Sequence, residues 1–209
     1  MTVWNYQPTE IFLNYDPKLS WTELGSISES YSNVSIKIDD KDNIYLVGDS
    51  HSKVLVAKFS IDENLEWSQL FGNENSYGTN YSNFDISRDG TVYVVGDTYG
   101  SFNNQEILSG RDGFITKLSS EGVEEWTKFT SDSKDFNYLS DVKIHSDGHI
   151  YVCGHEYLPD HNYQSFVSKF DSSGNQIWKK IIPNTLEDVS KTEFSIGLTL
   201  DNEGKIYLL

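Results

Sequence analysis

The stretch NIYLVGD at residues 43–49 decides the fold, because the chain repeats it three more times. It returns as TVYVVGD at 91–97, as HIYVCGH at 149–155 and, shortened, as KIYLL at 205–209. The copies are spaced by roughly 50–60 residues, a period typical of repeats that are small sheets of short strands. Such a sheet cannot bury both of its faces alone, and radial stacking of several sheets makes a β-propeller.

A second motif runs in phase with the first and places a Trp after a Lys and a tight turn. The pairs are Lys58 and Trp67, Lys117 and Trp126, and Lys169 and Trp178. The residues between them are rich in Asp, Asn, Ser and Gly, which accept tight turns. Each unit is therefore predicted to contain four antiparallel strands. The fixed phase of the Trp residues predicts packing between blades and argues against a carbohydrate platform.

The predicted fold class is all-β, a β-propeller of four-stranded antiparallel blades with about four blades' worth of sequence in a single domain. The expected boundaries are the domain at 1–209, the units 33–71, 82–129 and 139–181, and a split unit of 11–24 plus 194–209. Two interpretations stay open. The chain closes as a four-bladed ring whose termini share a sheet, or it is part of a larger propeller.

The run DGFITKLSSEG at residues 112–122, followed by Trp126, resembles the bacterial SBBP repeat, which takes its name from seven-bladed β-propellers. The runs DVKIHSDGHIYVCG at 141–154 and SFVSKFDSSGN at 165–175 resemble it as well. The resemblance implies a scaffold in large surface or secreted bacterial proteins, and no catalytic motif travels with it. This chain departs from the family because it is too short for seven blades.

Composition limits the partners of the protein. With 209 residues, 37% of them hydrophobic, the chain is long enough to bury a core. Its 32 acidic and 16 basic residues give a formal net charge of -16, which disfavours nucleic acid and anionic membrane surfaces. Residues 1–16 show neither the basic start nor the apolar run of a signal peptide. No apolar stretch is long enough for membrane insertion.

Three polar residues occupy the same position after the repeated strand, directly following its Gly. They are Asp49, Asp97 and His155. Polar side chains repeated at one end of successive blades predict an axial or rim position that binds a cation or a sugar. The alternative is the capping of backbone groups at the ends of strands.

The remaining candidates point away from metals and other cofactors. Cys153 fills a slot that is Val47 and Val95 in other units, which predicts a small buried hydrophobic residue. The histidines near it, His145, His149 and His161, fit no zinc spacing. The acidic run 39–43 offers oxygen ligands for calcium, but it lacks the pattern of an EF-hand and matches an ordinary turn of the repeat.

No nucleophile elbow, phosphate loop or dinucleotide fingerprint is present, so we predict a protein that is not an enzyme and has no catalytic residues. The expected function is a scaffold or binding module in a larger extracellular, cell-surface or virion assembly. It would bind protein or glycan through its inter-strand loops, with self-association as an option. The longest loops, at about 99–111 and 156–164, are expected on one face.

The alternative function is a propeller enzyme, either a lyase or a glycoside hydrolase, with a site near the central axis. It would require polar residues outside the repeat pattern that converge on that axis. Paired carboxylates at a set separation are the usual form of such a site.

Overall fold

The computed structural model describes residues 32–50, 53–72, 78–102, 105–107, 110–130, 136–157, 163–182 and 197–209. Within these ranges the chain forms fourteen β-strands in four antiparallel sheets. The described segments include no helix with the length and apolar character needed to cross a membrane.

Three of the sheets contain four strands each, arranged in chain order, and we call them blades 1, 2 and 3. Blade 1 consists of β1 (Ser32–Ile38), β2 (Ile44–Ser50), β3 (Lys53–Phe59) and β4 (Leu65–Gly72). Blade 2 consists of β5 (Thr79–Ile86), β6 (Val92–Thr98), β7 (Asp112–Leu118) and β8 (Glu124–Phe129). Blade 3 consists of β9 (Asn137–Ile144), β10 (Ile150–Tyr157), β11 (Tyr163–Phe170) and β12 (Gln176–Ile181). Blade 4 is the hairpin of β13 (Leu198–Leu200) and β14 (Ile206–Leu208).

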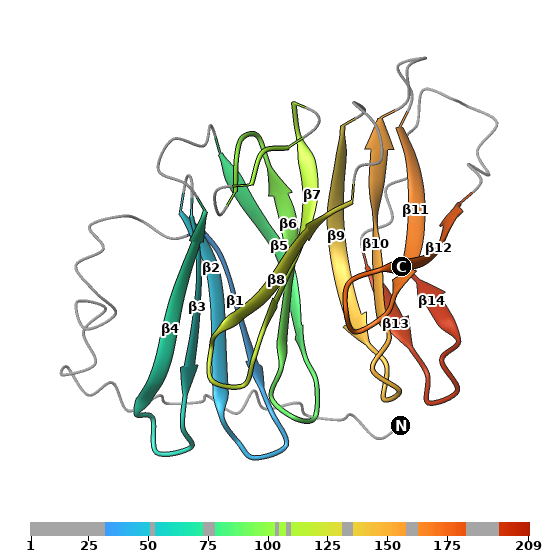
Figure 1. Cartoon of the computed structure of the whole chain (residues 1–209). Coiled ribbons are helices and arrows are strands. Elements are labelled where there is room, and N and C mark those ends of the chain that lie inside the picture. The colour runs from blue at the N-terminus through green and yellow to red at the C-terminus, as the bar shows by residue number, and fades with distance from the viewer. Residues whose placement is uncertain are drawn as a thin grey trace, which may run out of the picture.

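The blades stand face to face in chain order (Figure 1). Their first strands β1, β5, β9 and β13 contact one another in succession, and we call these the inner strands. This stack of four-stranded antiparallel sheets confirms the predicted all-β propeller fold. The predicted pairing of residues 11–24 with 194–209 lies largely outside the described residues. Ring closure, the single domain 1–209 and its unit boundaries therefore stay predictions.

One side of the molecule is formed by tight hairpin turns, and we call it the turn side. Seven turns among the described residues share one pattern, in which the first residue bonds the fifth through the backbone, as in Asp39 to Asn43. The fourth residue has a positive φ in every one, and it is Gly in five turns and Asp42 or Glu63 in the others. A turn followed by a left-handed residue is a common three-residue hairpin loop, and Gly adopts that conformation without a steric penalty.

The acidic run 39–43 is one of these turns. The Asp39 carboxylate accepts the backbone N–H groups of Lys41 and Asn43, the Asn43 amide and the Tyr45 hydroxyl. Burial opposes ionisation of Asp39, but the hydrogen bonds from Asn43 and Lys41 outweigh it and lower the pKa of Asp39. Burial and the charge of Asp39 in turn raise the pKa of Tyr45. The turn itself therefore engages both carboxylate oxygens of Asp39.

The Gly of the repeated motif allows two strands of one blade to approach closely. A Cβ on Gly96 would lie 2.0 Å from the carbonyl oxygen of Asn80, and one on Gly154 would lie 2.1 Å from that of Tyr138. The register of the first two strands shifts at this level in blades 2 and 3. In both blades a β-bulge of the first strand therefore lies opposite the motif Gly, which leaves room for the close approach.

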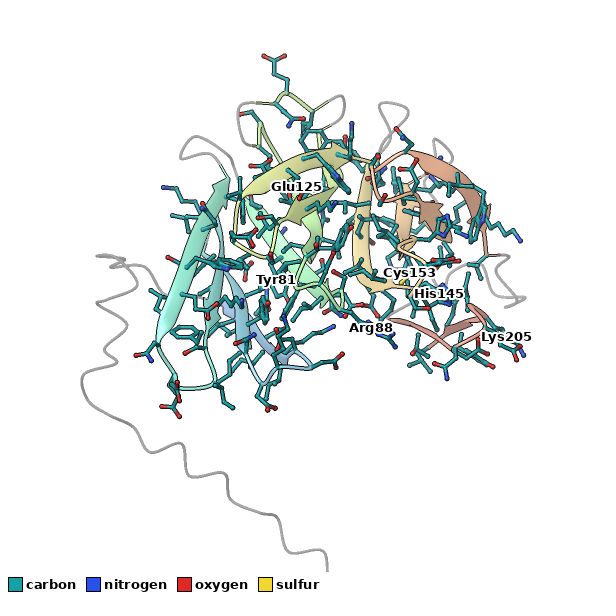
Figure 2. The ribbon with its side chains drawn as sticks, turned by 60° about the horizontal axis from the view of Figure 1, so that its bottom comes forward. Tyr81, Arg88, Glu125, His145, Cys153 and Lys205 are labelled. Carbon is teal, nitrogen blue, oxygen red and sulfur yellow. The ribbon has the colours of Figure 1, made fainter. Side chains whose placement is uncertain are left out.

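The core lies between the blades, where apolar side chains of neighbouring sheets fill the space (Figure 2). In blades 1, 2 and 3 the repeated Tyr contacts the Trp of its own blade edge to face, as Tyr93 does with Trp126. That Trp also reaches the next blade, because Trp67 Nε1 donates to the carbonyl of Ser120 and Trp126 Nε1 to that of Ser172. The prediction that the Trp residues pack between blades is confirmed.

Candidate functional site

The three polar residues of the repeated motif lie at the same end of β2, β6 and β10, opposite the turn side. We call this the loop side, because the connections from β6 to β7 and from β10 to β11 leave the sheets there (Figure 1). Asp49, Asp97 and His155 are 4%, 2% and 3% exposed. They belong to the second strands of their blades, so they lie beside the inner strands rather than on them.

Asp97 forms an ion pair that is specific to blade 2. Its carboxylate accepts two bonds from Arg111, from Nε at 2.8 Å and from a terminal nitrogen at 3.0 Å, and a third from the Asn80 amide at 3.0 Å. Burial lowers the pKa of Arg111, but the hydrogen bonds and charge of Asp97 outweigh it and raise that pKa overall. A bidentate pair of this kind fixes the guanidinium plane. Asp97 is therefore engaged by a side chain and does not serve only as a backbone cap.

Arg111 connects blade 2 to blade 3 through aromatic rings. Its guanidinium carbon lies 4.9 Å from the ring centre of Tyr99 and 4.5 Å from that of Tyr138, which belongs to β9. Both distances are in the range of cation–π attraction. Burial, followed by the nearby Tyr163 hydroxyl, raises the pKa of Tyr138. The phenol ring is thus neutral at physiological pH and packs as an aromatic face.

The aromatic contacts continue across blade 3. The ring centre of Tyr138 lies 5.1 Å from that of His155 and 6.3 Å from that of Tyr163. The ring centres of Tyr163 and Tyr157 are 4.9 Å apart. His155 Nδ1 is 3.3 Å from the Ser165 hydroxyl, and Phe136 packs 6.2 Å from Tyr157. We call the whole group the aromatic rim; its members are Tyr99, Arg111, Phe136, Tyr138, Tyr157 and Tyr163.

The structure brings two of the three predicted residues into one network. Asp97 and His155 are connected through Arg111 and Tyr138, although they are in different blades. Asp49 lies apart from this network in blade 1, where the amide of Asn33 is 3.4 Å from its carboxylate. The aromatic rim was missed by sequence reasoning. Its only signal was the loop length, because Tyr99 and Arg111 bound the long connection between β6 and β7.

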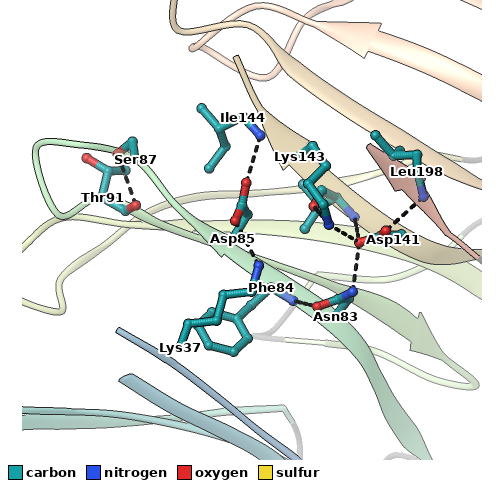
Figure 3. Close-up of polar contacts among 11 residues, drawn as sticks. Lys37, Asn83, Phe84, Asp85, Ser87, Thr91, Asp141, Lys143, Ile144 and Leu198 are labelled. Carbon is teal, nitrogen blue, oxygen red and sulfur yellow. Dashed lines mark hydrogen bonds and ion pairs between the residues drawn. The ribbon is translucent and has the colours of Figure 1, made fainter. Parts of the chain in front are cut away.

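A second polar network joins the inner strands, and the sequence analysis did not single it out (Figure 3). Lys37 of blade 1 donates to Asp85 of blade 2 at 2.8 Å, and Asp85 accepts the backbone N–H of Ile144 in blade 3 at 2.9 Å. Each bond crosses from one blade to the next. The second one also satisfies a backbone donor on an inner strand, whose edge pairs with no further strand among the described residues.

Asp141 extends this network to blade 4. Its carboxylate accepts the Asn83 amide of blade 2 at 2.7 Å, the Lys143 ammonium at 2.8 Å and the backbone N–H of Leu198 in blade 4 at 2.8 Å. Gly197 holds the position that Asn83 and Asp141 hold in the preceding blades. Because Gly197 has no side chain to bond the following N–H, Asp141 supplies the acceptor from the neighbouring blade.

Histidine and cysteine residues are dispersed within the described part of the chain. No three His, Cys, Asp or Glu side chains gather there in a way that holds a metal ion. Cys153 is fully buried among apolar residues between blades 3 and 4, as predicted from its slot in the repeat. His145 and His149 both approach Asp147, at 2.9 Å and 2.8 Å. His161 lies outside the described residues.

Comparison with known proteins adds little to this geometry. No protein-family model matches the chain, and no curated protein matches it. Among solved structures, the crystal structure of a protein from Lactobacillus plantarum is similar, with a TM-score of 0.42 and 14% sequence identity. The alignment covers 72% of this chain and 40% of that one, so this chain spans less than half the length of the protein it resembles.

Proposed function

We propose that this protein is a non-catalytic binding module whose aromatic rim holds a segment of a partner protein. The observation that carries the proposal is the exposure of three aromatic rings of the rim, one of which, Tyr99, contacts the fixed Arg111. Tyr99 is 42% exposed, Phe136 43% and Tyr163 38%, although most other rings of the described chain are packed between blades. Tyr and Arg are the residues that most often contribute large binding energies at protein interfaces.

The rim is already ordered before a partner arrives. Arg111 is held by two bonds to Asp97, and Tyr163 is held edge to face against Tyr157. Ordering side chains upon association costs free energy, so a preformed surface binds with less loss. Because Asp97 compensates the charge of Arg111, a partner that covers the guanidinium does not bury an unpaired cation.

The charge of the chain indicates the chemistry of the partner. A net charge of -16 attracts basic surfaces and raises the rate of encounter with them. The rings of the rim offer apolar faces and cation–π sites to a partner's Arg or Lys side chains. A basic segment that also carries apolar side chains therefore fits this face better than a neutral glycan does.

The saturation of the central carboxylates supports a function without catalysis. Asp85 accepts bonds from Lys37 and Ile144, and Asp141 accepts four bonds from three blades. A glycoside hydrolase requires two carboxyl groups that flank a substrate. These two instead act as connectors between blades, so the alternative of an axial lyase or hydrolase gains no support from them.

The larger setting is part of the same proposal. The resemblance to SBBP repeats supports a place in an extracellular, cell-surface or virion assembly of bacterial origin. The strongly acidic surface suits a protein that must stay soluble in such a setting. A module of this kind would present its loop side to a partner.

Panning a random peptide library against the protein tests the proposal. We expect enriched peptides that combine Lys or Arg with apolar residues. Their affinity should fall by at least about tenfold in Tyr99→Ala and Phe136→Ala, as for hot-spot residues. Val123→Ala is the matched control, because Val123 is also exposed but lies in a turn of blade 2, and it should leave the affinity unchanged.

A glycan array run in parallel separates the alternatives. Binding of a glycan that is lost in the two rim variants, without any enriched peptide, would replace the protein partner by a sugar. Peptides that bind the rim variants as well as the wild type would show that the rim is not the binding surface.

A further inference from the structure

A hollow of about 420 Å³ opens on the turn side, where hairpin turns of blades 2, 3 and 4 meet. Its apolar lining consists of Ile86, Ile144 and Leu200, which hold the same position at the ends of three successive inner strands. All three side chains are only half-buried. The hollow is within the size range of sites for small molecules, which are mostly apolar with a few polar groups that converge on the ligand.

Three hydrogen-bond donors surround this apolar lining. Arg88, Ser146 and Asn202 each hold the second position of their turn, and all three line the hollow. Within the described part of the chain, none of these side chains forms a hydrogen bond or an ion pair. Arg88 lies beside His145 on this side of the molecule (Figure 2). The equivalent residue of blade 1 is Asp40, which does not line the hollow.

The acidic residues of the hollow are already engaged by their own turns. Asp89 accepts the Ser87 hydroxyl and the backbone N–H of Thr91. Asp201 accepts the backbone N–H groups of Glu203 and Lys205 and the hydroxyl of Tyr207. Both bonds to Asp89 end on Oδ1, and neither carboxylate forms a hydrogen bond or an ion pair with Arg88 within the described residues. The guanidinium is therefore the charged donor that remains available to a ligand.

The His145 ring lines the hollow, but we do not expect it to donate a hydrogen bond to a ligand. Its Nδ1 is 2.9 Å from Asp147, close enough for an ion pair when the ring is protonated, but the two atoms are not aligned as a hydrogen bond. Its Nε2 is shielded from solvent and would lie 3.4 Å from a Cβ on Gly204. The polar recognition in the hollow thus falls to the three turn residues.

We propose that this hollow binds a small organic carboxylate. The carboxylate would pair with the Arg88 guanidinium, whose planar fork matches its geometry, and would accept bonds from Ser146 and Asn202. The apolar body of the ligand would cover Ile86, Ile144 and Leu200. These aliphatic residues favour an organic acid over inorganic phosphate, which has no apolar part to place there.

The experiment is a titration of the intact chain with hexanoate, hexanamide and inorganic phosphate, followed by backbone amide chemical shifts. We expect hexanoate to cause saturable shifts at residues 86–90, 144–148 and 200–202. Hexanamide and phosphate should bind at least about tenfold more weakly, because hexanamide lacks the carboxylate and phosphate lacks the apolar body. A short apolar peptide with a free carboxyl terminus, compared with its terminal amide, distinguishes a chain terminus from a free acid as the source.

Arg88→Gln should weaken hexanoate binding by at least about tenfold. Lys41→Gln removes a positive charge from a turn of blade 1 outside the hollow, and it should change the affinity by less than about twofold. The proposal is overturned if no carboxylate shifts these residues at millimolar concentration. Equal binding of hexanamide, or an unchanged affinity in Arg88→Gln, would overturn it as well.

Discussion

The turn side of this molecule repeats one backbone geometry, whereas the loop side differs in its side-chain contacts from blade to blade. On the turn side, one hairpin solution occurs seven times within the described residues, with the same backbone bonds and the same left-handed fourth residue. On the loop side, the end of each second strand has its own chemistry. Asp49 approaches an asparagine, Asp97 is paired with Arg111, and His155 contacts Tyr138.

The comparison teaches where repetition ends and individual chemistry begins. The hairpin geometry requires the same backbone at every turn and restricts the fourth residue through its positive φ, whereas the side chain at the second turn position is open to choice. The loop side carries no such requirement, so residues there differ between blades and contact one another across them. Both proposed binding surfaces use the positions that are free to vary: the rim on the loop side, and Arg88, Ser146 and Asn202 on the turn side.

The largest effect is expected at an inner-strand position that differs in every blade. Asp141→Ala should lower the free energy of unfolding by about 3–5 kcal/mol, because it leaves two buried backbone N–H groups, the half-buried Lys143 ammonium and the half-buried Asn83 amide without their acceptor. The backbone N–H of Leu198 is one of these groups, so amide hydrogen exchange should accelerate there. Chemical denaturation gives the free energy, and Asp141→Asn, which keeps one acceptor oxygen, should lose less.

A loss below about 1 kcal/mol in Asp141→Ala would contradict this account, since such a value is typical of an exposed ion pair. It would also show that positions which differ between blades, such as Asp141, contribute less to the stability of the fold than the repeated positions do.

Asp141 also shows how far sequence reasoning reaches. The four strands of each blade, the turns and the packing of Trp126 between blades follow from the period, because each copy repeats the same local requirement. The role of Asp141 depends on Gly197, more than fifty residues away, where a side chain is missing. No local pattern encodes that dependence.

The same limit applies to the loop side. The repeat placed Asp97 and His155 at one end of their strands. The partner of Asp97, however, follows a connection whose length is not set by the repeat, and Tyr138 comes from the next blade. Arg111 and Tyr138 could not be assigned to this site before the blades were placed side by side.

A smaller effect distinguishes two glycines of the turn side that share one backbone conformation. Gly122 has φ +79° and Gly148 has φ +85°. A Cβ on Gly122 would lie 2.5 Å from the Trp67 ring, whereas nothing lies within 4 Å of one on Gly148. Gly148→Ala should cost about 1–2 kcal/mol from the left-handed conformation alone. Gly122→Ala should cost about 1–3 kcal/mol more because of the overlap with Trp67.

Thermal and chemical denaturation of the two variants measure this difference. In a Trp67→Leu background, Gly122→Ala should cost less than it does in the wild type, since the smaller side chain removes the overlap. Equal destabilisation by the two single glycine variants would show that the repeated turn alone sets the cost and that the contact between blades does not.

The smallest effect is expected where copies of the repeat are exchanged. Cys153 occupies the slot of Val47 and Val95, and all three side chains are fully buried. Cys153→Val should therefore change the free energy of unfolding by less than about 1.5 kcal/mol, as a conservative change of volume usually does. Cys153→Ser is the matched control: the hydroxyl is similar in size but polar, and burying it should cost about 1–3 kcal/mol.

Metal content gives this last prediction a second measurement. Zinc should stay at background in the wild type and in Cys153→Val, because an apolar slot between blades 3 and 4 does not bring metal ligands together. If the wild type carried stoichiometric zinc that Cys153→Val lost, Cys153 would be a ligand rather than a packing residue. Cys153 would then have a role that Val47 and Val95 do not share, and side-chain chemistry specific to one blade would occur inside the core as well as on the loop side.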